Sequence, residues 1–232
     1  MYKNQLLSQL SDRKLVVQNL GLTPYKTVWR YQQELVSLKK SNRDMRDILL
    51  ICEHPPVYTL GTGSSLDFVH FDRQDSTYEI HRIERGGEVT HHCPGQIVLY
   101  PILDLNYHLR DLHWYLRQLE QVVISALAAW GIAAHRLEGL TGVWVKGYKV
   151  AAVGIKVSRW ITMHGLALNV CPDMTGFSSI TPCGISDRPV GSLSQFDPSL
   201  TVDQARAQLL AAFVKIFGFS SWSTEMPTTT CL

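Results

Sequence analysis

Three strand-like segments follow one another in the second half of the chain. Val143-Trp144-Val145 and Tyr148-Lys149-Val150 flank Lys146-Gly147, a pair suited to a two-residue hairpin turn. β-Rich sequence continues over Val150–Val157 and Ile161–Val170. Strands joined by such short turns are antiparallel neighbours, so this part of the chain predicts a sheet that is not wholly parallel.

Helical periodicity marks three further segments. Apolar residues recur at helical spacing from Val28 to Leu38, after a proline suited to a first turn. A longer leucine-rich stripe predicts a helix over Asn106–Trp130. A last helix is expected to begin at Thr201, with Gln204 completing a capping box, and to end at Gly218.

Asp47–Glu53 and Ile97–Leu103 are typical of buried strands, so strands outnumber helices. A chain of 232 residues can bury one large core. We therefore expect an α/β fold of a single domain, residues 1–232, in which a mixed β-sheet carries flanking helices. The sequence offers no fingerprint of a doubly wound dinucleotide-binding fold.

Composition excludes several classes of protein. A formal net charge of +2 indicates no nucleic-acid partner. No apolar run is long enough to span a membrane, and the N-terminus lacks the features of a secretion signal, so a cytoplasmic location is expected. Five cysteines without a CxxC pair predict neither a disulfide framework nor a structural zinc site.

The segment RGGEVTHHCPGQ, Arg85–Gln96, combines residues that a structural segment rarely needs together. Paired glycines allow a backbone to approach a ligand, and a guanidinium can fix a polar group. Its flanks are strand-like, so we interpret it as a ligand-binding loop between strands. His91, His92 and Cys93 are adjacent, and neighbours on an extended chain point to opposite faces, so no metal site is expected here.

Three other residues could carry chemistry, and residue type alone leaves each open. Cys183, between Pro182 and a turn glycine, suits a nucleophile but also a small buried apolar residue. Lys149 opens a predicted buried strand, where a lysine either reaches solvent or is held inside as a catalytic group. His164 is an acid–base candidate or a core histidine with Asn169 as its partner.

Six separated blocks between about residues 50 and 190 resemble the lipoyl(octanoyl) transferase family in content and order. They are EHPPVYTLG (53–61), RGGEVTHHCPGQ (85–96), LTGVWV (140–145), KVAAVGIKV (149–157), HGLALNV (164–170) and PCGI (182–185). The resemblance implies a fold related to the catalytic domains of lipoate and biotin protein ligases. It implies transfer of an octanoyl group from acyl carrier protein to a lysine of lipoyl domains, in 2-oxoacid dehydrogenase complexes and the glycine cleavage H protein.

The resemblance also assigns roles to residues of this chain. Cys183 matches the family's nucleophile, which forms a thioester acyl-enzyme, and Lys149 matches its acid–base lysine. No cofactor is expected, because the acyl group arrives activated on the phosphopantetheine of the carrier protein. The implied walls of the acyl pocket are Arg85, Gly86, Gly87, Glu88, Val89, Thr90, His91 and His92 on one side, with Ala152, Val153 and Gly154, and Gly165, Leu166 and Ala167, on the others.

The chain departs from the family at two positions. The family commonly has Tyr-His-Gly where His91, His92 and Cys93 stand here. His91 puts a role of the usual tyrosine hydroxyl in doubt. Cys93 replaces a glycine at an expected bend, and its thiol could pair with Cys183 under oxidation.

Three rival functions remain open from the sequence. An ATP-dependent ligase of the same fold would need a nucleotide-binding loop, which the sequence does not show, and would use free octanoate. A thioester hydrolase using Cys183 with His164 would release octanoate without a lipoyl domain. A non-catalytic binder of carrier protein or lipoyl domains would need neither Cys183 nor Lys149.

Overall fold

The structure, a computed structural model, describes residues 13–72, 77–181 and 189–225. Its helices are α2 (Tyr25–Ser41), α3 (Leu112–Ala128) and α4 (Val202–Phe217). Its strands are β1 (Lys14–Leu22), β2 (Asp47–Glu53), β3 (Val57–Leu60), β4 (Ile80–Arg82), β5 (Val89–His92), β6 (Gln96–Ile102), β7 (Val143–Val145), β8 (Tyr148–Ser158), β9 (Ile161–Asn169) and β10 (Ser221–Ser223).

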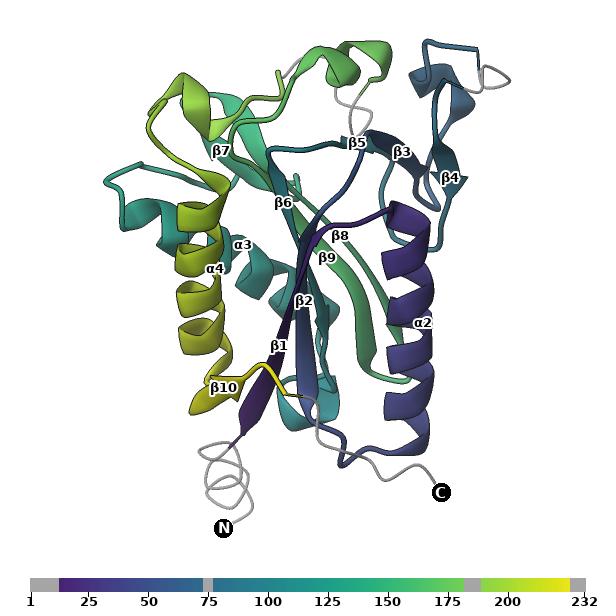
Figure 1. The fold of residues 1–232 in the computed structure, drawn as a ribbon, viewed down its shortest axis with the longest axis vertical. Coiled ribbons are helices and arrows are strands. Elements are labelled where there is room, and N and C mark those ends of the chain that lie inside the picture. The colour runs from purple at the N-terminus through teal and green to yellow at the C-terminus, as the bar shows by residue number, and fades with distance from the viewer. Residues whose placement is uncertain (1–12, 73–76, 182–188, 226–232) are drawn as a thin grey trace.

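The main sheet has the strand order β10-β1-β2-β6-β9-β8-β7. β1 is parallel to both β10 and β2, and every later pairing in this sheet is antiparallel. A second, three-stranded sheet, β4-β3-β5, lies beside the N-terminal end of α2 (Figure 1). The predicted mixed sheet with flanking helices is therefore confirmed.

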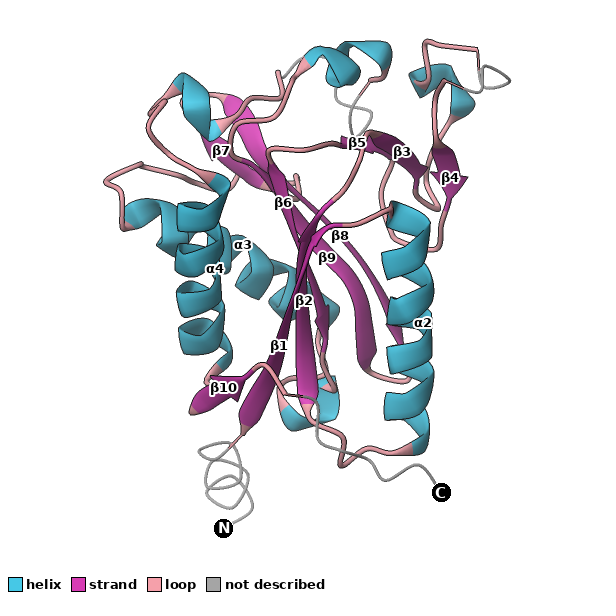
Figure 2. Cartoon of the chain, viewed as in Figure 1, coloured by secondary structure: helices cyan, strands magenta, loops and turns pink. Residues whose placement is uncertain are grey.

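Helices cover the main sheet on both faces, as Figure 2 shows, with α2 on one side and α3 and α4 on the other. Alternation along β2 divides the core accordingly. Ile48 and Leu50 pack with α2, whereas Leu49 and Ile51 pack with α3 and α4. All four are 1% exposed or less, as a strand covered on both faces requires.

The hairpin around Lys146-Gly147 is confirmed. Both residues have positive φ, 48° and 88°, as a type I′ turn demands, and the turn joins β7 directly to β8. Thr201 and Gln204 form the expected capping box of α4, and Gly218 ends that helix in the left-handed conformation. These local sequence patterns carried enough information to fix the local structure.

The helix expected over Asn106–Trp130 begins later, at Leu112. The Asp111 carboxylate accepts hydrogen bonds from the His113 and Trp114 amides, so it caps the helix at that point. Leu109 lies before the cap and is 48% exposed, outside the buried stripe. A similar correction applies to α2, where Leu38 at the end of the predicted stripe is exposed.

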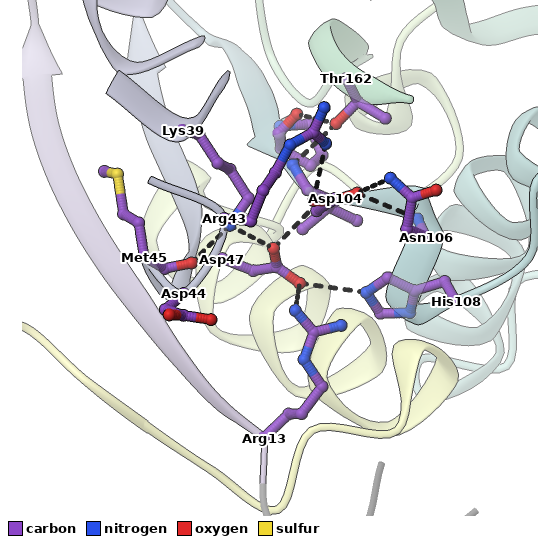
Figure 3. Close-up of polar contacts among 12 residues, drawn as sticks. Arg13, Lys39, Arg43, Asp44, Met45, Asp47, Asp104, Asn106, His108 and Thr162 are labelled. Atoms are coloured by element: carbon purple, nitrogen blue, oxygen red, sulfur yellow. Dashed lines mark hydrogen bonds and ion pairs between the residues drawn. The ribbon is translucent and has the colours of Figure 1, made fainter. Parts of the chain in front are cut away.

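Asp47, at the start of β2, lies at the centre of a buried charge cluster (Figure 3). Its carboxylate pairs with Arg13 and Lys39, each at 2.8 Å, and with His108 at 3.1 Å. The backbone amide of Asp104 also donates to it. These contacts join the residue before β1 to β2, α2 and the segment after β6. No helix within the described ranges is long and apolar enough to cross a membrane.

Candidate functional site

A cavity of about 220 Å³ opens between the Arg85–Glu88 segment, α2, and strands β5, β6, β8 and β9. Its lining includes twelve of the fourteen positions predicted as pocket walls: Arg85, Gly86, Gly87, Glu88, Thr90, His92, Ala152, Val153, Gly154, Gly165, Leu166 and Ala167. Val89 and His91 do not line it. Lys149 does, so the cavity brings the predicted lysine and the predicted walls together.

Small residues give the cavity its floor. On the antiparallel β8–β9 ladder, Ala152 pairs with Ala167 and Gly154 pairs with Gly165. Paired positions share a face of the sheet, and Ala167 packs on the α2 side. The two pairs therefore leave a shallow trough along β8 and β9, on the side facing α2.

The Arg85–Glu88 segment, here called the arch, forms the opposite wall. The amides of Thr62 and Gly63 donate to the Arg85 and Gly87 carbonyls at 2.9 and 3.2 Å. The amide of Gly86 donates to the Ile155 carbonyl at 2.9 Å, which joins the arch to β8. Backbone hydrogen bonds from the Gly61-Thr62-Gly63 loop therefore hold the arch in place.

Two glycines make this packing possible. A Cβ atom at Gly61 would lie 2.1 Å from the Gly87 carbonyl oxygen. At Gly154 a Cβ would lie 3.1 Å from Arg85 Cδ. Arg85 is nearly buried, and its Nη2 donates to the Thr59 carbonyl at 2.8 Å and to Thr59 Oγ1 at 3.0 Å. Its guanidinium thereby holds the arch on β3.

β5 presents its two histidines to opposite sides, as the extended spacing predicts. His92 lines the cavity, and its Nδ1 lies 2.6 Å from Gln96 Oε1. Gln96 Nε2 donates to Asn169 Oδ1 and to the His91 carbonyl. Since the amide nitrogen is committed to those acceptors, its oxygen accepts from His92 Nδ1–H. Burial holds the pKa of His92 well below its usual range, so the ring is neutral and Nε2 carries the lone pair.

The segment Arg85–Gln96 is therefore not a simple loop, because β5 occupies its centre. His91 faces away from the cavity, with its ring 4.5 Å from Tyr58 and 5.4 Å from Phe177 between centroids. Burial lowers its pKa to about 4. Cys93 contacts the Asp173 carbonyl on the same side, at 3.6 Å, and its backbone avoids the left-handed region. The bend falls instead at Gly95, with φ of 87°.

Lys149 is the second residue of β8, and it lines the cavity. It is 7% exposed, and its Nζ lies 5.3 Å from the centroid of the buried Trp144 ring, within reach of a cation–π attraction. Its amide donates to the Pro189 carbonyl at 2.9 Å, and its carbonyl accepts from Gly191. The Gly142 amide beside it donates to buried Glu120 at 2.9 Å.

Cys183 lies outside the described residues. On either side of it the described chain is hydrogen-bonded to other segments, and Pro189 is bonded to Lys149 itself. The Thr181 amide donates to the Phe68 carbonyl at 2.9 Å, and Pro189 accepts from the Lys149 amide at 2.9 Å.

His164 takes an unusual position at one end of the cavity. Its φ is +59°, a left-handed value that is rare for a residue inside a strand. Its amide donates to Gln32 Oε1 at 2.9 Å, and its Nε2 lies 3.7 Å from Glu84. The expected partner was wrong: Asn169 bonds Gln96 and the Gly191 carbonyl instead.

Sequence reasoning missed six lining residues: Tyr25, Val98, Tyr100, Gly139, Leu140 and Thr141. Alternation along β6 could have indicated that Val98 and Tyr100 share a face. Nothing local places Tyr25 there, because α2 reaches the cavity only through tertiary packing.

Within residues 13–72, 77–181 and 189–225, no three His, Cys, Asp or Glu side chains gather closely enough to hold a metal ion.

Comparison with known proteins matches this sequence and its architecture to one class. A model of the lipoyl protein ligase A/B catalytic domain matches residues 24–214. A structure of lipoate-protein ligase A bound with ATP superposes with a TM-score of 0.72 at 15% identity, covering 94% of this chain and 90% of that one. At this identity the likeness concerns the fold alone, and it confirms the expected relation to lipoate ligases.

Sequence relatives narrow the assignment. An octanoyltransferase of Nostoc sp. is 58% identical over 207 residues, which cover 89% of this chain and 94% of the relative. A chloroplastic octanoyltransferase of Arabidopsis thaliana is 48% identical over 211 residues, covering 84% and 75% respectively. The chain belongs to the octanoyltransferase family, and the expected activity class, an acyltransferase of lipoate biosynthesis, is confirmed.

Proposed function

We propose that this enzyme moves an octanoyl group from acyl carrier protein to a lysine of a lipoyl domain, through a thioester on Cys183. The observation that carries the proposal is the position of Lys149. A buried lysine at an apolar cavity with a floor of alanine and glycine can hold a proton beside the carbonyl end of an acyl chain.

The cavity accounts for the acyl chain. Lys149, Ala152 and Gly154 follow one another along β8, and all three line the cavity. A chain that begins beside Lys149 therefore runs along the small-residue trough toward Gly154. Each buried CH₂ group contributes about 0.8 kcal/mol to the binding free energy. Most of the affinity for an octanoyl group therefore comes from its alkyl chain.

Proton transfer balances in two halves. Cys183 thiolate attacks the thioester carbonyl of octanoyl-carrier protein, and the phosphopantetheine thiolate leaves with a proton from the Lys149 ammonium. The acceptor amine then attacks the Cys183 thioester and gives a proton to the neutral Lys149 amine. Cys183 leaves as thiolate, and the products are an amide and the free carrier thiol.

The positive charge of Lys149 also favours the thiolate of a nearby cysteine. The Trp144 ring, with its centroid 5.3 Å from Nζ, helps to hold the ammonium in place. No ATP is required in this scheme, because the thioester is already activated. The acceptors we expect are the lipoyl domains of 2-oxoacid dehydrogenase complexes and the glycine cleavage H protein, in the cytoplasm.

Intact mass spectrometry tests the proposal. Mixing the enzyme with octanoyl-carrier protein should produce an octanoyl adduct, and a lipoyl domain should then remove it. Cys183→Ser should form no thioester adduct. Lys149→Arg, which keeps the charge but cannot release its proton, should lose transfer by at least about a hundredfold.

A cavity variant completes the test. Ala167→Leu fills the trough and should raise KM for octanoyl-carrier protein. Release of free octanoate by the wild type in the absence of a lipoyl domain, at the transfer rate, would favour the hydrolase instead. Use of free octanoate with ATP would favour a ligase.

A further inference from the structure

A second hollow continues the line of the acyl cavity along the face of the sheet that α2 covers. It has a volume of about 220 Å³ and is lined by Gln33, Val36, Lys40, Glu84, Lys156, Ser158, Ile161 and Met163. Lys156 and Met163 pair on the β8–β9 ladder, two rungs beyond the Gly154–Gly165 pair that lines the acyl cavity, with the Ile155–His164 pair between them. The two spaces therefore follow one another along the same trough.

Glu84 and His164 stand between the two spaces. Glu84 lines the second hollow, and His164 lines the acyl cavity. His164 Nε2 lies 3.7 Å from Glu84 Oε1, so the two side chains meet across the boundary. Trp29 Nε1 donates to both Glu84 carboxylate oxygens at 3.1 and 3.2 Å, which fixes the carboxylate to α2.

The backbone of His164 explains how its ring reaches this place. Neighbouring residues of β9 alternate, with Leu166 and Leu168 packed on the α3 and α4 side. Regular alternation would send His164 to that same side. Its φ of +59° breaks the alternation, and its amide and ring turn toward Gln32 and Glu84 on the α2 side.

A left-handed histidine costs of order 1–3 kcal/mol and persists only where its surroundings impose it. Here the imposed conformation places a polar pair across an otherwise apolar trough. Extending an alkyl chain past this point would bury the Glu84 carboxylate against hydrocarbon and separate it from its hydrogen-bond donors, which is unfavourable.

We propose that Glu84 and His164 form a partition that ends the acyl slot and so determines the length of acyl chain the enzyme transfers. This rests on the proposed function, in which the cavity holds the acyl chain. Opening the partition would join the two spaces and let a longer chain reach Val36, Ile161 and Met163.

The test compares octanoyl, decanoyl and dodecanoyl groups on acyl carrier protein, with transfer to a lipoyl domain. His164→Gly removes the ring and accommodates the left-handed backbone. Each additional buried CH₂ gains about 0.8 kcal/mol, roughly fourfold in binding. We expect the ratio of kcat/KM for dodecanoyl over octanoyl to rise by about tenfold or more.

Further variants isolate the partition. Met163→Trp, added to His164→Gly, should fill the second hollow and return the ratio toward the wild-type value. Glu84→Gln keeps the size but removes the charge, and it should raise the ratio less. Glu79→Gln is the matched control: this exposed carboxylate also pairs with a histidine, His81, at 2.7 Å, but lines neither of these spaces, and the ratio should not change.

An unchanged ratio in His164→Gly, or an equal decline for all three chain lengths, would overturn the partition. If His164→Gly does not fold, His164→Asn tolerates the left-handed backbone and replaces it. Ala167→Leu separates this failure from that of the proposed function. If Ala167→Leu leaves octanoyl transfer intact, the cavity does not hold the acyl chain at all.

Discussion

A Cβ atom at Gly142 would lie 2.6 Å from Cε of Lys149. The Lys149 side chain therefore occupies space that is free only because residue 142 is a glycine. Gly142 also has φ of +141°, and its amide bonds Glu120 inside the protein, so its backbone has little room to shift.

Gly142→Ala should therefore displace the Lys149 side chain and lower kcat for transfer by about tenfold or more, since small displacements of a catalytic group are costly. Steady-state transfer to a lipoyl domain measures the loss. The control is Gly147→Ala, at φ of +88° with nothing within 4 Å of the added methyl. Both variants should lose stability, but only Gly142→Ala should lose activity; equal activities would contradict the steric argument.

Gln96 connects three buried groups, and its replacement should destabilise the fold. Gln96→Leu leaves His92 Nδ1–H, the Asn169 oxygen and the His91 carbonyl without their partner. Each unsatisfied buried group costs about 1–3 kcal/mol, so the free energy of unfolding should fall by about 3 kcal/mol or more. Urea denaturation measures this. Half-buried Gln118, changed to leucine, should cost far less, and a similar cost would refute the network.

The charge cluster around Asp47 predicts a particular pH dependence. Burial alone would raise the pKa of Asp47, but the His108 hydrogen bond and the charges of Lys39 and Arg13 outweigh it and hold the pKa well below its usual range. A carboxyl whose pKa is depressed by folding stabilises the protein above its unfolded pKa of about 4 and loses that contribution as the pH falls.

Asp47→Asn should thus be much less stable than the wild type at pH 7, by about 3–5 kcal/mol, because Arg13 and Lys39 lose a buried charged partner and His108 loses a charged hydrogen-bond acceptor. The difference should shrink below pH 4. Urea unfolding at several pH values tests both statements, with exposed Asp44→Asn as the control that changes little. A difference that grows toward acid pH would show that another group dominates.

The Cys93 thiol should react slowly with alkylating reagents and with peroxide. Burial, and then the charge of Asp173, raise its pKa to about 11, so at pH 8 only about one molecule in a thousand carries the thiolate. Iodoacetamide should label exposed Cys171 well before Cys93, with equal labelling in urea, as peptide mass mapping would show. Peroxide should likewise leave Cys93 unlinked to Cys183; a rapid linkage would contradict this.

Sequence patterns predicted those features of the fold that local conformation decides. Lys146-Gly147 fixed a hairpin because both positions require positive φ, and Thr201 fixed a helix start because its hydroxyl and Gln204 satisfy free amides. The apolar periodicity extends through Leu109 and therefore predicts too early a start for helix α3, whereas the Asp111 cap sets the true start.

The residues of the site also divide into those that local sequence patterns predict and those that depend on tertiary packing. The opposite directions of His91 and His92 follow from strand geometry alone. Tyr25 reaches the cavity only because α2 packs against β6 and β9, which no local pattern reveals. His164 shows no local indication of its left-handed backbone, because glycine and asparagine usually mark that conformation and here the glycine follows it. Its orientation depends on Gln32 and Glu84, which are distant in the sequence.

The arch and the trough have a consequence for how acyl preference can evolve in this enzyme. One wall is main chain held against the Gly61 loop, and the other is a row of alanine and glycine, with backbone contacts already at their limit. Point mutation can readily narrow such a space, but without rebuilding a strand it can widen it only by the methyl groups of the alanines. The cross-section of the slot is therefore inherited with the fold, and chain length is the dimension left to selection.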